Sequence, residues 1–345
     1  MPVISASHEF DVSDLFVNLQ PFFGRRLFLK VEGFNFAGSI KLKAAREMVA
    51  QAEAAGALGP GATLVESSSG NMGVALALLA ASRGFRFLCV TDSRCNAVTR
   101  RTMESLGAEV HVITEPHATE GFLGARIRHV KALLAADDKK VWLNQYLSPG
   151  NWMAHYRTTA PAIARQFPDL SVLFVGAGTT GTLMGCARYF RERRPSVRVV
   201  AVDSVGSVTF GAPAATRHIP GLGTSVRPAL LDESLVDAVV HVPEAATVRT
   251  CRELMRHGFS FGGSTGTVVT GALDWLSEQY GDPASGIREQ VTAVTISPDL
   301  GERYMETVYH DEWVRNSLGP NGLTESAEEV WAGTEPAAGL ESVSG

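Results

Sequence analysis

The sequence has few cysteines, few candidate metal ligands and no long hydrophobic run. Only 4 of its 345 residues are cysteine, and they stand far apart without CxxC pairs, which argues against a disulfide scaffold or a zinc site. The 9 histidines include no HExxH motif and no regular pairing with cysteine, so we predict no metal. The longest apolar run, Val74 to Ala81, is too short to span a bilayer, and the N-terminus lacks the pattern of a signal peptide.

The charge balance narrows the classes of partner. A formal net charge of −5 gives no electrostatic footprint for nucleic acid or for an anionic membrane. The isolated cysteines favour a reducing compartment. We therefore expect a cytoplasmic protein whose partners are small molecules and not nucleic acid or membrane.

The pattern of hydrophobic residues, 45% of the chain, predicts the fold class. Short β-branched apolar runs alternate with segments of helical spacing, which indicates an α/β fold with parallel sheets. The predicted strands are Thr63 to Val65, Phe85 to Val90, Glu109 to Ile113, Val141 to Asn144, Val172 to Val175, Val197 to Val202 and Val291 to Ser297. The predicted helices include Ile40 to Ala55, with Ser39 as its cap, Met72 to Arg83, Trp152 to Arg165, Thr182 to Arg194, Ala245 to Arg256 and Thr265 to Glu278.

The length of the chain suggests about two domains. Turn residues at Ser148-Pro149-Gly150 separate two sets of alternating elements and place a boundary there. We expect a smaller α/β domain over residues 36–148 and a larger one made of residues 1–35 and 149–318. From Gly319 onward Gly, Ser, Glu and Pro dominate, so residues 319–345 are predicted to form a flexible tail.

A lysine follows a polar turn at the start of the first predicted helix. Asn35 to Ser39 form the turn, and Lys41 falls in the first helical turn, where the helix dipole disfavours a cation. Lysine suits that place if its nitrogen is neutral or bound as an imine, as a nucleophilic lysine requires. The alternative is a solvated surface lysine.

A second motif, Glu66 to Gly73, lies between a predicted strand and a predicted helix. It contains three serines, a glycine and Asn71 in the order SSSGN. Small residues allow close approach of a ligand, and successive N–H groups at a helix N-terminus favour a carboxylate or phosphate. The motif is therefore a candidate seat for a substrate carboxylate, or a simple helix cap.

A third motif, Gly176 to Thr182, is rich in glycine and threonine and precedes another helix. Its backbone amides and hydroxyls suit a phosphate. Gly176, Gly178 and Gly181 also match GxGxxG, and Asp203 ends the next strand, as in a dinucleotide fingerprint. A nicotinamide or flavin site, another phosphate site and a structural turn all remain open.

The fourth motif, Phe261 to Gly266, contains Ser264 in a GxSxG arrangement. Asp299 and His310 follow in the chain order of a serine hydrolase. The elbow serine of a hydrolase should follow an apolar strand, however, and the residues before this one include Arg256 and His257. The hydrolase interpretation is therefore weakly supported.

Together these motifs, in this order, resemble the cysteine synthase-like family of pyridoxal-phosphate enzymes, which have fold type II. The resemblance runs from about Leu27 to Trp313. It is closest to members that make a precursor of 2,3-diaminopropionate for siderophores or peptide antibiotics. The stretches that carry this closer resemblance are Asn144 to Tyr146, Val202 to Ser207 with Phe210-Gly211, and Pro298 to Trp313.

The resemblance implies pyridoxal 5'-phosphate as cofactor and assigns roles to the motifs. Lys41 would be the Schiff-base lysine, Asn71 would bind the ring hydroxyl, and Ser264 would face the pyridine nitrogen. The residues around the cofactor phosphate would be Gly178, Thr179, Thr180, Gly181 and Thr182. The substrate-binding residues would be Ser68, Ser69, Gly70, Met72, Arg126, Gln145 and Tyr146. Arg126 has a second interpretation as a solvated helix residue.

The resemblance also implies a reaction: β-replacement that joins O-phospho-L-serine to L-glutamate, in a homodimer whose smaller domain closes over the SSSGN loop. Phe36, Leu42, Lys43 and Met72 depart from the cysteine synthase pattern, which favours another donor or nucleophile. The alternatives are a cysteine synthase using sulfide with O-acetylserine or O-phosphoserine, an NAD-dependent dehydrogenase, and a non-catalytic binding protein on the same fold.

Overall fold

The computed structural model describes residues 3–281 and 291–319, and it contains two β-sheets. The larger sheet has the order β1-β2-β10-β7-β8-β9, and the smaller has the order β5-β4-β3-β6. The larger sheet consists of β1 (Phe16–Asn18), β2 (Leu27–Val31), β7 (Leu170–Gly176), β8 (Arg198–Ser204), β9 (Ala238–Val242) and β10 (Thr292–Ser297). The smaller sheet consists of β3 (Thr63–Ser67), β4 (Arg86–Asp92), β5 (Glu109–Ile113) and β6 (Lys140–Trp142).

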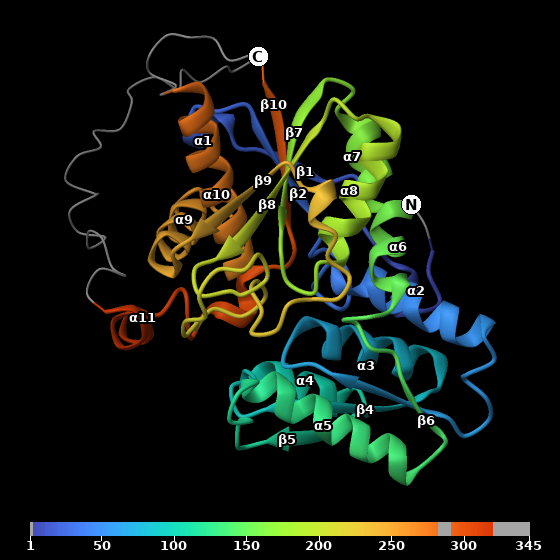
Figure 1. Cartoon of the computed structure of the whole chain (residues 1–345). Helices are drawn as coiled ribbons and strands as arrows, with labels where there is room; N and C mark the ends of the chain where they lie inside the picture. Colours follow the sequence, from blue (N-terminus) through green and yellow to red (C-terminus); the bar gives the residue numbers. More distant parts are fainter. Residues whose placement is uncertain (1–2, 282–290, 320–345) are drawn as a thin grey trace, which may run out of the picture.

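Apart from the antiparallel pair β1 and β2, neighbouring strands run parallel, which confirms the predicted α/β class. Figure 1 shows α9 and α10 on one face of the larger sheet and α7 and α8 on the other, with the smaller sheet beside them. The helices are α1 (Gln20–Phe23), α2 (Lys41–Ala54), α3 (Asn71–Arg83), α4 (Ala97–Ser105), α5 (Gly121–Ala136), α6 (Pro149–Arg157), α7 (Thr159–Gln166), α8 (Gly181–Arg193), α9 (Glu244–Arg256), α10 (Gly263–Tyr280) and α11 (Asp311–Leu318).

The core of the larger sheet follows from the alternation of side chains along a strand. In β7, Val172 and Phe174 pack with residues of α10, whereas Leu173 and Val175 pack with residues of α8. Because both faces of the strand are buried, its sequence is a nearly continuous apolar run. This is why its position was predictable from the sequence.

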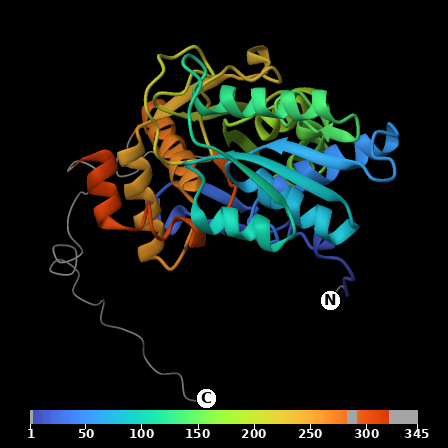
Figure 2. The ribbon, with the colours of Figure 1, turned by 90° about the horizontal axis from the view of Figure 1, so that it is seen from below.

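The smaller sheet has its own core. Helices α2 and α3 contribute to one hydrophobic cluster on it, and Val130 of α5 packs with Val65, Leu88 and Val90 in another. Figure 2 shows the smaller sheet and its helices from below. In the part of the chain that the structure describes, no helix combines the length and apolarity needed to cross a bilayer.

The parallel strands place the predicted motifs at helix N-termini. β3 ends at Ser67 and α3 begins at Asn71; β7 ends at Gly176 and α8 begins at Gly181. In open α/β sheets, ligands bind outside the carboxyl ends of the strands. The SSSGN and glycine-threonine motifs both lie at such ends.

Two predictions about helices were wrong. The predicted helix from Trp152 to Arg165 is two helices, α6 and α7, separated at Thr158. Pro161 has no N–H to continue the first helix and instead occupies the first turn of the second. Ser39 does not cap α2, because the helix has Ile40 at its N-cap and the hydroxyl of Ser39 is buried without a hydrogen bond.

Other elements were absent from the predictions or end elsewhere. β1, β2, β9, α1, α4, α5 and α11 were not predicted. β6 ends at Trp142, whereas the prediction ran to Asn144, whose φ of 53° lies in the left-handed region and cannot continue a strand. The predicted tail lies outside the described residues except for Gly319.

Candidate active site

A cavity of about 420 Å³ is lined by every residue that the resemblance assigned to the cofactor or to a substrate. The predicted residues that line it are Lys41, Ser68, Ser69, Gly70, Asn71, Met72, Arg126, Gln145, Tyr146, Gly178, Thr179, Thr180, Gly181, Thr182 and Ser264. A second hollow of about 510 Å³ lies against α6 and α8 and is lined by none of them. The four motifs, widely separated in the sequence, therefore meet at one place.

Lys41 is the first residue of α2 and lines this cavity. Burial lowers the pKa of its amine to about 8, and the nearby negative charge of Asp299 opposes part of that shift. A neutral amine is thus far more accessible than on an ordinary surface lysine. The burial of the amine argues against the alternative of a solvated surface lysine.

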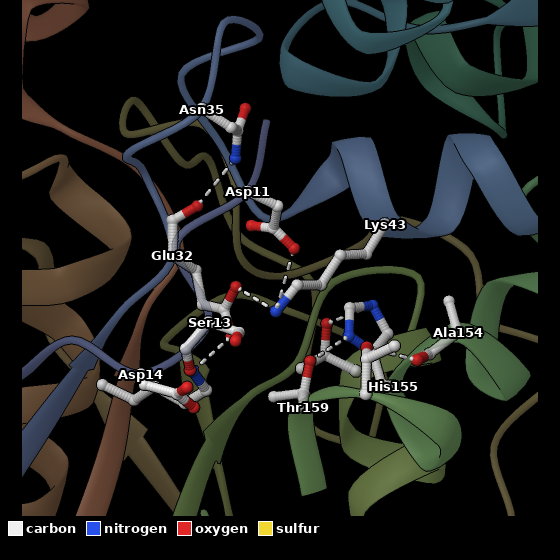
Figure 3. Close-up of polar contacts among 12 residues, drawn as sticks. Asp11, Ser13, Asp14, Glu32, Asn35, Lys43, Ala154, His155 and Thr159 are labelled. Atoms are coloured by element: carbon white, nitrogen blue, oxygen red, sulfur yellow. Dashed lines mark hydrogen bonds and ion pairs between the residues drawn. The ribbon is translucent and has the colours of Figure 1, made fainter. Parts of the chain in front are cut away.

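The first turn of α2 is tied to β2 by a set of charges that we call the buried ion network: Asp11, Lys30, Glu32 and Lys43. Lys43 Nζ lies 2.6 Å from Glu32 Oε2 and 3.7 Å from Asp11 Oδ2, and Lys30 Nζ lies 3.0 Å from Glu32 Oε1. Figure 3 shows Lys43 reaching toward Asp11 and Glu32. Two cations thus face two carboxylates, and Lys43, which departs from the cysteine synthase pattern, is a structural anchor for the helix of Lys41.

Asn71 is held by residues from the other end of the chain. Its Nδ2 donates to Asp299 Oδ2 at 2.7 Å, and Arg303 Nη1 donates to its Oδ1. Tyr304 Oη also donates to Asp299 Oδ2, at 2.7 Å, and Arg303 Nη2 donates to the carbonyl of Ala37 at 2.8 Å. The amide is therefore fixed in orientation, with one Nδ2 hydrogen still available to a ligand.

The SSSGN loop is both a helix cap and a part of the cavity wall. The hydroxyl of Ser68 accepts hydrogen bonds from the backbone N–H groups of Gly70, at 3.2 Å, and Gly73, at 3.0 Å. Ser69 and Gly70 are partly exposed and line the cavity. The hydroxyl of Ser68 is thus already engaged, which agrees with the simple-cap alternative for that side chain.

Gln145 stabilises the same loop through two hydrogen bonds, a connection that we call the Gln145 brace. Its Nε2 donates to the carbonyl of Ser67 at 3.0 Å, and its backbone N–H donates to Glu66 Oε2 at 3.2 Å. Burial raises the pKa of the Glu66 carboxyl to about 7. Asn151 Nδ2 donates both to the carbonyl of Gln145, at 2.6 Å, and to Thr179 Oγ1, at 2.9 Å. Asn151 thus links this brace to the glycine-threonine loop.

The glycine-threonine loop has a shape suited to a phosphate. Thr180 has a φ of 64°, a left-handed conformation that a threonine rarely adopts, and no side chain caps the N-terminus of α8. A Cβ on Gly178 would lie 2.9 Å from the carbonyl oxygen of Gly221, so only glycine fits there. Uncapped amides at the N-terminus of a helix are a ready anion site. These residues fit the phosphate of the cofactor that the resemblance implies.

His155 of α6, which no sequence motif singled out, contacts that loop. Its Nε2 lies 3.2 Å from Thr182 Oγ1, and its Nδ1 lies 3.0 Å from Thr159 Oγ1. Burial lowers the pKa of the imidazole well below its ordinary value, and the charges of Lys43 and Lys41 add to the effect. A neutral histidine therefore supports the loop, and Figure 3 shows it beside Thr159.

The structure does not assemble the two competing sites. Asp203 is fully buried, accepts a hydrogen bond from the backbone of Ser204 at 2.8 Å and does not line the cavity. His310 accepts from the backbone N–H of Trp313 at the start of α11 and also lies outside the cavity lining. Within residues 3–281 and 291–319, no group of three histidines, cysteines or carboxylates could hold a metal.

Arg126 is not a solvated helix residue. Its side chain is 7% exposed, its Nε lies 3.3 Å from Asp92 Oδ2, and its Nη1 is buried without a hydrogen-bond partner among the described residues. Tyr146 lies close to it: burial raises the pKa of the phenol, and both the charge of Arg126 and a side-chain hydrogen bond with it oppose the shift. A buried guanidinium with a free donor at a cavity is suited to an anionic group.

Sequence reasoning gave no role to several residues of the cavity. Arg94, Arg217, Arg303 and Tyr304 all line it. Arg303 and Tyr304 lie within the stretch Pro298 to Trp313, so that stretch was the available signal for them. No motif marked Arg94 or Arg217.

Comparisons with known proteins agree with this site. The family described as pyridoxal-phosphate dependent enzyme matches residues 16–287. A relative from Cupriavidus metallidurans, named N-(2-amino-2-carboxyethyl)-L-glutamate synthase, is 38% identical over 303 residues, 86% of this chain and 87% of its own length. A relative of the same name from Ralstonia nicotianae is 39% identical over 290 residues, 84% of this chain and 83% of its own length.

A solved structure extends the likeness to the fold. O-ureido-L-serine synthase is 30% identical, with a TM-score of 0.80, over 96% of this chain and 100% of its own. The cofactor expected from the sequence is thereby confirmed, as is the fold class. The chain belongs to the pyridoxal-phosphate dependent enzymes.

Proposed function

We propose that this enzyme joins O-phospho-L-serine to L-glutamate and releases phosphate and N-(2-amino-2-carboxyethyl)-L-glutamate, a step toward 2,3-diaminopropionate for a siderophore or peptide antibiotic. The bond between Cβ and the phosphate oxygen of the donor breaks, and a bond forms between Cβ and the glutamate nitrogen, which loses a proton. The names of the two curated relatives support this reaction. The observation in the structure that carries it is Arg126, a buried cation with an unpartnered donor at the cavity.

The cofactor would be held by residues from three motifs. The loop from Gly178 to Thr182 would bind its phosphate, Asn71 Nδ2 would donate to its ring hydroxyl, and Ser264 Oγ would face its ring nitrogen. When bound, pyridoxal phosphate supplies an electron sink that stabilises negative charge at the substrate α-carbon. Lys41 would attach it covalently.

Lys41 has a second part in the proposed reaction. Its Nζ would take the α-proton of the donor and would return that proton once the new Cβ–N bond had formed. A pKa of about 8 suits both steps, because the amine can gain or lose a proton near neutral pH. The same nitrogen thus serves as anchor and base.

The donor's two anionic groups would occupy different walls. Backbone N–H groups around Ser69 and Gly70 would bind its carboxylate, and Arg126 with Tyr146 would bind its phosphate. Met72 and Gln145 would complete this wall. Phosphate is a good fit for Arg126 because a guanidinium binds its oxygens in a bidentate manner.

The proposal includes a domain closure, a cellular compartment and an oligomeric state. Residues 36–148, which contain the whole smaller sheet, would move as a domain toward the rest of the chain and exclude water from the cavity. We also propose a cytoplasmic homodimer; the four free cysteines suit a reducing compartment.

Product analysis tests the reaction. Purified protein loaded with pyridoxal phosphate is incubated with both substrates, and adduct and phosphate are measured by mass spectrometry and a phosphate assay. We expect equal amounts of both. Phosphate without adduct would refute glutamate as the nucleophile, and faster formation of cysteine from sulfide would identify a cysteine synthase. Reaction with O-acetylserine but not with O-phosphoserine would refute the donor.

A further inference from the structure

The charges around the cavity are unbalanced. Among the described residues that line it there are one lysine and four arginines, Arg94, Arg126, Arg217 and Arg303, but no aspartate and no glutamate. Arg303 is engaged with Asn71 and Ala37, and Lys41 is the residue of the chemistry. The other three arginines, which we call the arginine group, require a separate explanation.

One carboxylate serves two members of the arginine group. Asp92 Oδ1 lies 3.4 Å from Arg94 Nε, and Asp92 Oδ2 lies 3.3 Å from Arg126 Nε. Arg217 has no carboxylate within 4.0 Å in the described parts of the chain. Within the described residues, Asp92 is thus the carboxylate that pairs with this group inside 4.0 Å, while Asp203 and Glu244 act on Arg217 from further away. A cavity lined by cations with so few close carboxylates favours anionic ligands.

Arg217 is held rigidly at the cavity. Its Nη1 donates to the carbonyls of Gly206 and Thr224, each at 2.9 Å. Burial lowers the pKa of its guanidinium; the charges of Asp203 and Glu244 oppose this shift, and the charge of Arg94 adds to it. The remaining N–H groups of Arg217 have no partner in the parts of the chain that are described, and a fixed guanidinium binds a carboxylate with little loss of entropy.

The positions of Arg94 and Arg217 favour the amine substrate over the donor as their ligand. The side chain of Arg94 is 61% exposed, whereas that of Arg126 is 7% exposed, so Arg94 lies at the mouth and Arg126 in the interior. The donor must reach Lys41 first, and its carboxylate and phosphate already have partners in the proposed site. The amine enters afterwards and leaves its carboxylates nearer the mouth.

We infer that Arg217, assisted by Arg94, binds a carboxylate of the amine substrate and selects a dicarboxylic amine as nucleophile. The inference deepens the proposed function and rests on it. The amine of this substrate would reach Cβ of the donor while its carboxylates compensate the positive charge of the arginine group. An amine without a carboxylate side chain would leave that charge unpaired.

The test substitutes Arg217→Gln, with Arg227→Gln as the matched control. Arg227 lies on the same segment between β8 and β9, pairs with Glu233 and does not line the cavity. We expect the KM for glutamate to rise roughly tenfold to hundredfold in Arg217→Gln, as for the loss of a charged hydrogen-bonded contact. Phosphate release without amine should change far less, and Arg227→Gln should match the unsubstituted enzyme.

A second measurement separates this inference from the reaction itself. Glutarate, a dicarboxylate that cannot react, is titrated calorimetrically into each holoenzyme, and its binding should weaken by a similar factor in Arg217→Gln only. If the unsubstituted enzyme forms no glutamate adduct, the proposed function fails, and glutarate still decides the subsite. Equal glutarate affinity in both variants would overturn the inference. So would a fall in the rate of phosphate release in Arg217→Gln by the same factor as the rise in its KM for glutamate.

Discussion

Two groups of charged residues near Lys41 are built in opposite ways. The buried ion network pairs two lysines with two carboxylates and supports the helix of Lys41 from behind. The arginine group, at the cavity, has three cations and, among the described residues, one carboxylate within 4.0 Å, Asp92. Charges that are satisfied within the protein fix a position, whereas charges that are left in excess bind a ligand.

The sharpest comparison is between two lysines in one helical turn. Lys41→Ala should reduce turnover by at least about a thousandfold, because it removes the proposed anchor and base, and should leave the unfolding free energy nearly unchanged. Circular dichroism and thermal unfolding of the apo-protein check the second point. Lys43→Ala is the control, since it should destabilise the fold through Glu32. Normal turnover in Lys41→Ala would remove the central claim.

The buried ion network should be sensitive to loss of one carboxylate. Glu32→Gln leaves Lys30 and Lys43 with Asp11 as their nearest anion, so the unfolding free energy should fall by about 3–5 kcal/mol, as for broken buried pairs. Urea denaturation of the apo-protein measures it. The control is Glu53→Gln, which breaks a partly exposed pair with Arg83 and should cost less than about 1 kcal/mol. Similar losses in both variants would contradict a structural role for the network.

Loss of Arg126 from the arginine group should weaken binding of the donor. Arg126→Gln should raise the KM for O-phospho-L-serine roughly tenfold to hundredfold, while the affinity for pyridoxal phosphate changes little. Steady-state kinetics at saturating glutamate and a cofactor titration measure the two quantities. An unchanged donor KM would show that the arginine binds no part of the donor.

The two groups also show where sequence reasoning succeeds and where it fails. The positions of Lys41, Asn71 and the glycine-threonine loop at helix starts were predictable, because helix starts and small residues are local signals. Strand β2 was not, because Lys30 interrupts its apolar pattern and Glu32 follows it, and only pairing across the fold makes the burial of these two charges possible.

The hydrogen-bond partners of Asn71 could not be predicted from the sequence for a similar reason. Asp299 and Arg303 lie 228 and 232 residues further along the chain, and no periodicity connects such distant positions. The excess charge of the arginine group was equally invisible, since it depends on which side chains share one cavity. The division at residue 148 stays a prediction.

The smallest expected effect lies between the two groups, in the titration of Lys41. The amine attacks the cofactor only when neutral, so covalent binding of pyridoxal phosphate to the apo-protein should accelerate as pH rises and level off above about 8. Asp299 opposes the lowering of this pKa, because its negative charge favours the protonated amine. In Asp299→Asn the midpoint should therefore move to lower pH.

Stopped-flow absorption between pH 6 and 10, a range chosen to bracket about 8, measures both midpoints. Glu302→Gln is a suitable control because it also removes a negative charge near Asp299 in the sequence, and Glu302 is exposed. A midpoint near the ordinary lysine value in the unsubstituted protein would mean that burial does not control this amine. A shift to higher pH in Asp299→Asn would mean that the carboxyl acts through the orientation of Asn71 and not through its charge.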